Sequence, residues 1–179
     1  MRTLLAVITA SLAISINPVY AEDAPADAFT ITTNAFLDTG ALPVLYTCDG
    51  KDISPQLEWT HVPAKTQSFA LLLTDPDAPK GTFYHWVVYN LPGNTTSLSE
   101  DDQKLPAGTL VGKNSFDKPR YNGPCPPKGS AHNYSLTLYA LDGKLNLPAG
   151  ASGKEVETAL QKHIIGKAVV TTVYSRWLQ

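Results

Sequence analysis

Charged residues are scarce in this 179-residue chain: they make up 17% of it, and the formal net charge is only −2. No cluster of lysine and arginine stands out along the sequence. Proteins that bind nucleic acid usually carry such a basic patch, so the composition argues against a nucleic-acid partner. The length is that of a single domain, which is large enough to bury a substantial hydrophobic core.

Long apolar runs are also missing, apart from a short one near the amino terminus. Arg2 precedes an apolar stretch over residues 4–16, and a Val-Tyr-Ala tripeptide ending at Ala21 follows it. This pattern is typical of a signal peptide that is cleaved after Ala21. A membrane anchor is the alternative, but a membrane-spanning helix needs about 20 apolar residues.

The amino-terminal pattern sets the expected domain organisation. We expect a signal peptide at 1–21, a flexible acidic leader at 22–27 and one domain over 28–179. The protein is therefore predicted to be periplasmic or secreted, with no integral membrane segment in the mature chain.

Cysteine is rare, since the chain contains only Cys48 and Cys125. An even number of cysteines in an exported protein favours a disulfide. The bond would join residues 77 positions apart, and chain-entropy arguments give such a loop about 4 kcal/mol of stabilisation. The alternative is a pair of buried thiols that never meet.

The residue pattern predicts a mainly-β fold. One helix is expected over 152–165, with Ser152 and Glu155 forming a capping box, His163 in its last turn and Gly166 ending it. A long loop with short extended pieces is expected over 95–120. Strands or extended pieces are predicted at 28–33, 42–47, 56–59, 68–74, 85–91, 134–141 and 167–174. Short strands, loops rich in Pro and Gly, and one late helix indicate an antiparallel β-sandwich.

Two aspartates lie between two apolar strands, in the loop sequence DPDAP at residues 75–79. In an extended segment the side chains of Asp75 and Asp77 would face the same way. If they lie near His85, at the start of the next strand, they would favour its protonated form. The alternative is a plain turn, because Asp before Pro is a common turn former and both carboxylates could be solvated.

A second histidine, His132, precedes its strand just as His85 opens its own. If these two strands are neighbours, both rings converge on the acidic loop. Gly123 and Gly129 would let backbone N–H groups approach an anion closely. Histidine and aspartate are also zinc ligands, but their spacing matches no usual zinc motif, and the chain lacks the Gly-x-Ser-x-Gly motif of many hydrolases.

Taken together, these motifs resemble those of the phosphatidylethanolamine-binding protein family, and in particular its bacterial Raf-kinase-inhibitor-like branch. The resemblance runs from about Phe29 to Trp177 and rests on residues 75–79, 85–86, 90–92, 123–129 and 132–134. It implies a Greek-key β-sandwich, with a small surface pocket for phosphate-like anions or phospholipid head groups.

The resemblance also implies which residues form the pocket. It assigns to ligand binding Asp75, Asp77, Pro79, His85, Gly123, Pro124, His132 and Tyr134. A protonated His85 or His132 and loop N–H groups would hold the anion, and Asp75 would orient His85. A non-proline cis peptide would lie near Gly81-Thr82.

Two departures from the eukaryotic members bear on this pocket. Cys48 and Cys125 are additions, so that their disulfide would brace the rim of the pocket. Eukaryotic members continue into a C-terminal helix that covers the pocket, and its absence here would leave the site more open.

Three functions are compatible with these residues. The favoured one is a binding protein for a small anionic ligand or a phospholipid head group, which is not an enzyme and uses no metal or other cofactor. The second is an interaction or inhibitor module that docks a protein partner, such as a protease or a host factor, through the pocket rim. The third, less favoured, is a phosphoester hydrolase that uses the Asp/His cluster.

Overall fold

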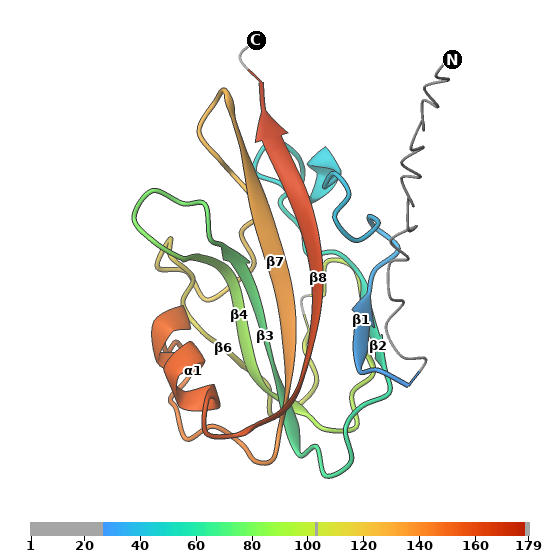
Figure 1. The fold of residues 1–179 in the computed structure, drawn as a ribbon. Helices are drawn as coiled ribbons and strands as arrows, with labels where there is room; N and C mark the ends of the chain where they lie inside the picture. The colour runs from blue at the N-terminus through green and yellow to red at the C-terminus, as the bar shows by residue number, and fades with distance from the viewer. Residues whose placement is uncertain (1–26, 103, 178–179) are drawn as a thin grey trace, which may run out of the picture.

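A five-stranded antiparallel sheet forms the body of the protein, in the order β6-β4-β3-β7-β8 (Figure 1). Its strands are β3 (Ser68–Asp75), β4 (Phe83–Pro92), β6 (Leu110–Val111), β7 (Ser130–Leu141) and β8 (Ile164–Arg176). The structure is a computed structural model that describes residues 27–102 and 104–177. The expected signal peptide and its cleavage site lie outside the described residues, as does the leader except for Asp27.

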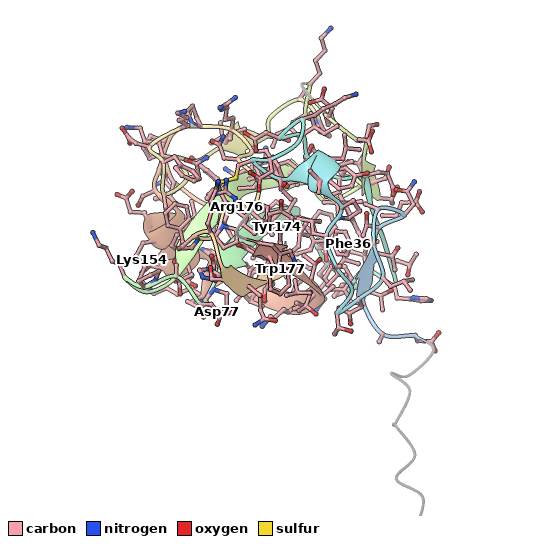
Figure 2. All side chains as sticks on the ribbon, turned by 90° about the horizontal axis from the view of Figure 1, so that it is seen from above. Phe36, Asp77, Lys154, Tyr174, Arg176 and Trp177 are labelled. Carbon is pink, nitrogen blue, oxygen red and sulfur yellow. A yellow bond between two sulfur atoms is a disulfide. The ribbon has the colours of Figure 1, made fainter. Side chains whose placement is uncertain are left out.

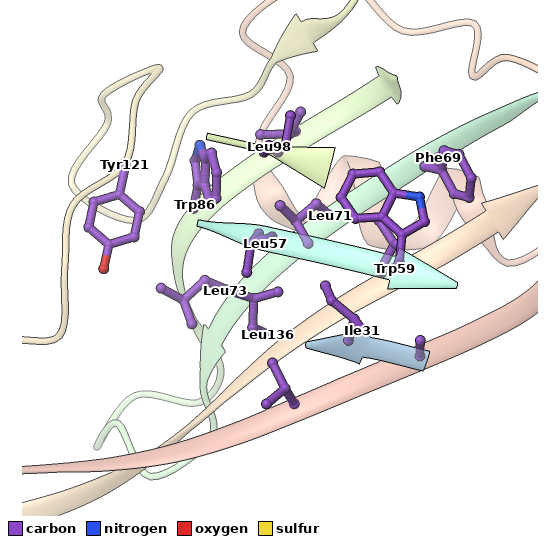
Figure 3. Packing of buried hydrophobic residues seen from close by; sticks show 14 of the residues in the cluster. Ile31, Leu57, Trp59, Phe69, Leu71, Leu73, Trp86, Leu98, Tyr121 and Leu136 are labelled. Atoms are coloured by element: carbon purple, nitrogen blue, oxygen red, sulfur yellow. The ribbon is translucent and has the colours of Figure 1, made fainter. Parts of the chain in front are cut away.

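A smaller three-stranded sheet, in the order β1-β2-β5, packs against one face of the large sheet. Its strands are β1 (Thr30–Thr32), β2 (Leu57–Thr60) and β5 (Ser97–Leu98). The Trp59 ring from β2 meets the Phe69 ring from β3 edge-on at 5.6 Å in the core between the sheets (Figure 3). The prediction of a mainly-β antiparallel sandwich with one late helix is confirmed.

The middle of strand β3, residues 69–73, is a continuous apolar run because both faces of the strand are covered. Phe69, Leu71 and Leu73 point into the core between the sheets. Ala70 and Leu72 belong to a second cluster on the opposite face, where the helix packs. A strand that is buried on both sides carries a continuous apolar run instead of an alternating one.

The helix α1 (Gly153–Leu160) begins as the sequence predicted but ends early. The Ser152 side chain accepts a hydrogen bond from the Glu155 N–H, and the Glu155 carboxylate accepts one from the Ser152 N–H, which together form the capping box. The prediction that the helix continues to 165 is wrong, since β8 begins at Ile164.

The residues that follow α1 explain this early end. His163 does not lie in the last turn of the helix but in the turn that follows it. There its N–H donates to the Leu160 carbonyl, and its Nδ1 lies 2.8 Å from an Asp142 carboxylate oxygen. Gly166 does not end the helix, because it pairs with Ala140 inside the sheet. The β-branched residues after the turn suit a strand better than a helix.

Residues 42–47 also differ from the prediction of an extended piece. They contain a short 3-10 helix over Val44–Tyr46, preceded by Pro43 at φ −60°. The Tyr46 N–H donates to the Pro43 carbonyl, and the buried Tyr46 side chain packs into the core. Pro43 therefore starts a helical turn at this point instead of marking an edge strand.

The loop from β3 to β4 has only trans peptide bonds. No cis peptide is present within the described residues, so the cis bond expected near Gly81-Thr82 is wrong. Gly81 instead takes a positive φ of 95° and donates its N–H to the Ala78 carbonyl.

Among the residues that the structure describes, no helix is long and apolar enough to cross a membrane.

Candidate functional site

A cavity of about 170 Å³ opens at the end of the large sheet, beside the loop that joins β3 to β4. Its wall is formed by Asp75, Ala78, Pro79, Phe83, His85, Phe116, Cys125, Pro126, Pro127 and His132. Four of the eight residues that the resemblance assigned to the ligand therefore line one cavity: Asp75, Pro79, His85 and His132.

The order of the strands brings the two histidines to the acidic loop. Asp75 is the last residue of β3, and His85 and His132 are the third residues of β4 and β7. The strands β4 and β7 are not direct neighbours, because β3 lies between them and pairs with both. This arrangement places one imidazole on either side of Asp75.

Asp75 holds His132 in place. Asp75 is 4% exposed and His132 is 8% exposed, and the His132 Nδ1 donates to Asp75 Oδ2 over 2.8 Å. The other oxygen, Oδ1, accepts the N–H of Asp77 at 2.9 Å. The expectation that Asp75 orients His85 is therefore wrong: the hydrogen bonds of this carboxylate go to His132 and to the loop, and the His85 Nδ1 has another partner.

His85 has a backbone partner instead. Its Nδ1 donates to the Asn122 carbonyl oxygen at 2.8 Å, and the Asn122 N–H donates to the His85 carbonyl oxygen at 3.1 Å. Burial lowers the pKa of His85, and this effect outweighs the nearby Asp75 charge, which raises it. The ring is packed among those of Phe83, Phe116 and Tyr134 at centroid distances of 5.0–6.0 Å, so it is shielded from water.

The protonated His85 that the sequence suggested is therefore not the form favoured at neutral pH. Because Nδ1 carries the proton that is donated to Asn122, Nε2 of the neutral ring has a free lone pair. His132 differs from His85 in its partner, because its Nδ1 lies against the Asp75 carboxylate and not against a backbone carbonyl.

The lowered pKa of His85 predicts a pH-dependent stability. Below about pH 6.5, the usual histidine pKa, the unfolded chain takes up a proton that the folded chain does not. The free energy of unfolding should therefore decrease as the pH falls from 6.5 towards the lowered folded pKa, by up to about 1.4 kcal/mol per pH unit. Above pH 6.5 the His85 ring is neutral in both the folded and the unfolded state, so this residue no longer makes the free energy of unfolding depend on pH.

Urea unfolding of the wild type and of His85→Gln between pH 5 and 8 measures this contribution. The variant should lose less stability on acidification than the wild type. His61→Gln, at an exposed histidine, is the matched control and should keep the wild-type slope. Identical slopes for His85→Gln and the wild type would contradict the neutral, buried state of His85.

Asp77 is exposed and does not line the cavity. Its Oδ2 accepts hydrogen bonds from the N–H and the side-chain amide of Asn133, both at 2.8 Å. These bonds lower the pKa of the Asp77 carboxyl. Asp77 thus ties the acidic loop to β7, whereas Asp75 reaches the cavity itself.

Gly123 and Pro124 lie behind the cavity wall. Both are buried, and the Gly123 N–H, which was expected to approach an anion, donates to Asp52 Oδ1 at 2.6 Å. A Cβ at Gly123 would clash with the Tyr46 carbonyl oxygen, so close packing requires a glycine here. The Pro124 carbonyl accepts the N–H of Cys48 at 3.2 Å.

Tyr134 lies beneath the cavity, with its ring close to those of His85 and His132. Its hydroxyl is buried and makes no hydrogen bond of good geometry within the described residues, although the Asp75 carboxylate is close enough to affect it. Burial, followed by the charges of Asp75 and Asp77, raises the pKa of Tyr134. The Tyr134 hydroxyl is therefore neutral and has a proton that it does not donate in a hydrogen bond to any described residue.

The Cys48–Cys125 disulfide is formed, with the two Cα atoms 5.4 Å apart, as the sequence predicted. Because Cys125 lines the cavity, the bond ties its rim to the 3-10 segment. Arg176 supports the same rim, since it donates to the Pro126 carbonyl and forms two hydrogen bonds of 2.7 Å with Asp49. A neighbouring hollow of about 520 Å³ is lined in part by Tyr174, Arg176 and Trp177. These three residues are labelled in Figure 2.

Sequence reasoning missed the aromatic part of the wall. Phe116 belongs to the region that was assigned to a long loop, and Phe83 opens β4 two residues before His85. The signal for Phe116 is weak: Asn114 begins a turn, and its Oδ1 accepts the N–H groups of Phe116 and Lys118. In the part of the chain that the structure describes, no group of three or more His, Cys, Asp or Glu side chains is placed to hold a metal ion.

Known proteins resemble this chain over most of its length. The family model described as "Phosphatidylethanolamine-binding protein" matches residues 32–175. A UPF0098 protein of Methanothermobacter thermautotrophicus is 44% identical over 149 residues, which cover 82% of this chain and 98% of that protein. The UPF0098 protein YbhB of Escherichia coli is 41% identical over 133 residues, which cover 71% of this chain and 84% of YbhB.

A solved structure agrees with these sequence matches. The crystal structure of E. coli YbcL, described as a new member of the mammalian PEBP family, superimposes with a TM-score of 0.79 at 35% sequence identity. The superposition covers 82% of this chain and 98% of YbcL.

Proposed function

The chain belongs to the phosphatidylethanolamine-binding protein family, and we propose that its cavity binds a small phosphate-like anion, either free or as the head group of a larger molecule. The observation that carries this proposal is the buried Asp75–His132 pair in the cavity wall. A histidine that is fixed by a carboxylate at one nitrogen presents its other nitrogen in a defined direction.

The anion would be held mainly by His132. When its ring is protonated, Nε2–H is a charged donor, and both Asp75 and a bound anion stabilise that positive charge. The neutral His85, with a free lone pair on Nε2, suits a ligand that still carries a proton on oxygen. A phosphate or phosphate monoester near neutral pH can accept from His132 and donate to His85 at the same time.

Titration with inorganic phosphate, followed by NMR of the histidine ring protons, tests this proposal. Millimolar phosphate should shift the His85 and His132 resonances. His132→Ala should weaken phosphate binding at least tenfold, because a hydrogen bond to a charged group is worth about 1.5–3 kcal/mol. His163→Ala, which changes a histidine outside the cavity lining, is the control and should bind phosphate like the wild type.

Two outcomes would contradict the anion site. The first is that neither the His85 nor the His132 resonance moves at millimolar phosphate. The second is that His132→Ala and His163→Ala weaken binding equally, which would indicate non-specific attraction to the protein as a whole.

We propose a binding protein and not an enzyme. Many hydrolases use a serine or a cysteine as the nucleophile. Among the described residues that line the cavity, Cys125 is the one residue of these two types, and its sulfur is bound in the disulfide and carries no free thiol. Such a bond persists in oxidising compartments, which supports export to the periplasm or beyond.

A protein partner is the second candidate, and one observation favours it. Trp177 is 77% exposed at the hollow next to the cavity rim, and Val44, on the same hollow, is also exposed. Exposed aromatic residues beside a pocket are common at protein interfaces. A partner could insert an acidic side chain into the anion cavity and rest on this surface.

A further inference from the structure

A second cavity, of about 190 Å³, lies beside the core between the two sheets. Its wall includes residues 52–54, which precede β2, residues 119–121, and Trp86 of β4. None of the described residues lines both this cavity and the anion cavity, so a ligand here would occupy a separate site. One water molecule takes up about 30 Å³ in the liquid, and the cavity therefore has room for a small organic molecule. We call it the indole cavity.

Two buried polar side chains in the wall of the indole cavity have no partner among the described residues. Trp86 is 3% exposed and Ser54 is 5% exposed, yet neither the indole N–H nor the hydroxyl makes a hydrogen bond there. By contrast, the buried indole of Trp59 donates to the Thr95 carbonyl at 2.8 Å. Buried polar groups are nearly always paired, and Figure 3 shows the indole nitrogen of Trp86 at the end of the ring that points away from Leu73. Both side chains are therefore placed to hydrogen-bond a ligand in the cavity.

Acidic side chains dominate the charged part of the wall. Asp52, Asp101 and Asp102 line the indole cavity, and Arg120 is the one basic residue among the described residues that line it. Asp102 Oδ1 accepts the N–H of Lys104 at 3.1 Å, whereas Oδ2 makes no hydrogen bond to a described residue. An excess of carboxylates in a partly enclosed space attracts a cation, so Asp102 Oδ2 suits a positively charged donor.

We propose that the indole cavity binds a small organic cation, namely a protonated amine on a short apolar chain that also carries a neutral carbonyl acceptor. The ammonium group would donate to Asp102, and the carbonyl oxygen would accept from Trp86 and Ser54. The apolar chain would lie against the apolar part of the wall, which includes Ile53 and Leu105. An amino-acid amide has this chemistry, and so has the amino-terminal residue of a peptide.

Hydrogen bonds fix the segments that form the wall. The Asp101 N–H donates to the Ser54 carbonyl at 3.0 Å, which ties two of the lining loops together. The Asp52 carboxylate accepts the Gly123 N–H at 2.6 Å and the side-chain amide of Asn122 at 2.9 Å. The cavity is thus formed before a ligand enters, and such preorganisation reduces the entropy lost on binding.

Tyr121 fixes the orientation of the Trp86 ring. The two rings meet edge-on, with centroids 5.6 Å apart and an angle of 81° between their planes. The Tyr121 hydroxyl donates to the Tyr46 carbonyl at 2.7 Å, so it is not a donor for the cavity. The indole N–H of Trp86 therefore has a defined direction, and its partner has to come from the cavity.

NMR of the indole N–H groups of the wild type tests this site, with leucinamide as the probe. At pH 6.5 the amine of leucinamide is protonated, since an α-amino group has a pKa of about 7.7–8.0. Millimolar leucinamide should shift the indole signal of Trp86, which its nuclear Overhauser effects to the Tyr121 ring identify. The signal of Trp59, whose indole is bonded to Thr95, is the internal control and should not move.

Two truncated ligands separate the contributions of charge and acceptor. The first, 4-methylpentanamide, lacks the amine and should bind at least tenfold more weakly than leucinamide, because it loses a hydrogen bond between charged groups. The second, 3-methylbutylamine, lacks the amide and should bind about fivefold more weakly, because it loses a neutral acceptor. The tripeptide amide Leu-Gly-Gly-NH₂ distinguishes the source of the ligand: binding like leucinamide would identify a peptide terminus, and much weaker binding a free small amine.

Substitutions in the wall should act on one part of the ligand each. Asp102→Asn should weaken leucinamide binding at least fivefold and leave the affinity for 4-methylpentanamide nearly unchanged. Ser54→Ala should weaken leucinamide binding and leave the affinity for 3-methylbutylamine nearly unchanged. Asp117→Asn removes an exposed carboxylate outside the cavity lining, and this matched control should bind leucinamide like the wild type.

Three results would overturn the proposal. The first is that leucinamide does not move the Trp86 indole signal, or that it moves the Trp59 signal equally. The second is that both truncated ligands bind as tightly as leucinamide. The third is that Asp102→Asn and Asp117→Asn weaken leucinamide binding to the same extent, which would indicate attraction to the overall negative charge and not to this cavity.

Discussion

Replacing both Cys48 and Cys125 with alanine is expected to lower the free energy of unfolding by about 4 kcal/mol. The two residues are 77 positions apart in the chain, so their bond removes many conformations from the unfolded state. For a domain of this size the loss corresponds to a decrease in Tm of roughly 8–16 °C. This is the largest stability effect that we expect from any change outside the hydrophobic core.

The folded state gives this bond a second role. Cys125 lines the anion cavity, and the neighbouring Pro124 carbonyl accepts the Cys48 N–H. Without the disulfide, the rim depends on this hydrogen bond and on the contacts of Arg176 with Pro126 and Asp49. We therefore expect weaker phosphate binding in the double variant, in addition to its lower stability.

Urea unfolding of the wild type, the double alanine variant and the reduced wild type measures the contribution. The reduced wild type is the control, since it loses the bond without a change of sequence, and it should unfold at nearly the same urea concentration as the variant. A decrease of less than about 1 kcal/mol in both would contradict a stabilising cross-link.

Much of the fold was accessible from the sequence, because local patterns agree with the packing that they meet. The apolar run of β3 reflects burial on both faces, and Ser152 with Glu155 marks the start of α1. The predictions failed where contacts distant in sequence decide the local structure. Residues 161–163 close a turn against Asp142 instead of continuing the helix, and no local pattern shows this.

The site was predictable in its location but not in its pairing. The ends of β3, β4 and β7 bring Asp75, His85 and His132 together, as the two motifs suggested. The partner of each histidine depends on β3 lying between the other two strands, which the sequence does not reveal. The partner of His85 is a backbone carbonyl of Asn122, and any residue type supplies such a group.

Replacing Asp75 with alanine should have a far greater effect than the same change at Asp77. Asp75→Ala leaves the buried Nδ1 of His132 without an acceptor, so we expect a loss of about 2–3 kcal/mol in the free energy of unfolding. It should also weaken phosphate binding at least tenfold, because the positive charge on His132 loses its stabilising carboxylate. Asp77→Ala is the matched control: it removes a carboxylate from the same loop whose two hydrogen bonds to Asn133 are exposed to solvent, so it should change both quantities less than Asp75→Ala does.

Asp75→Asn separates the charge of this residue from its hydrogen bond. The asparagine carbonyl oxygen can still accept the His132 Nδ1–H, so most of the stability lost in Asp75→Ala should return. Phosphate binding should remain weak, because a neutral amide does not favour the imidazolium ion that the anion requires. Wild-type affinity in Asp75→Asn would show that the anion is held without a charged His132, and the cavity would then act through neutral donors such as the Tyr134 hydroxyl.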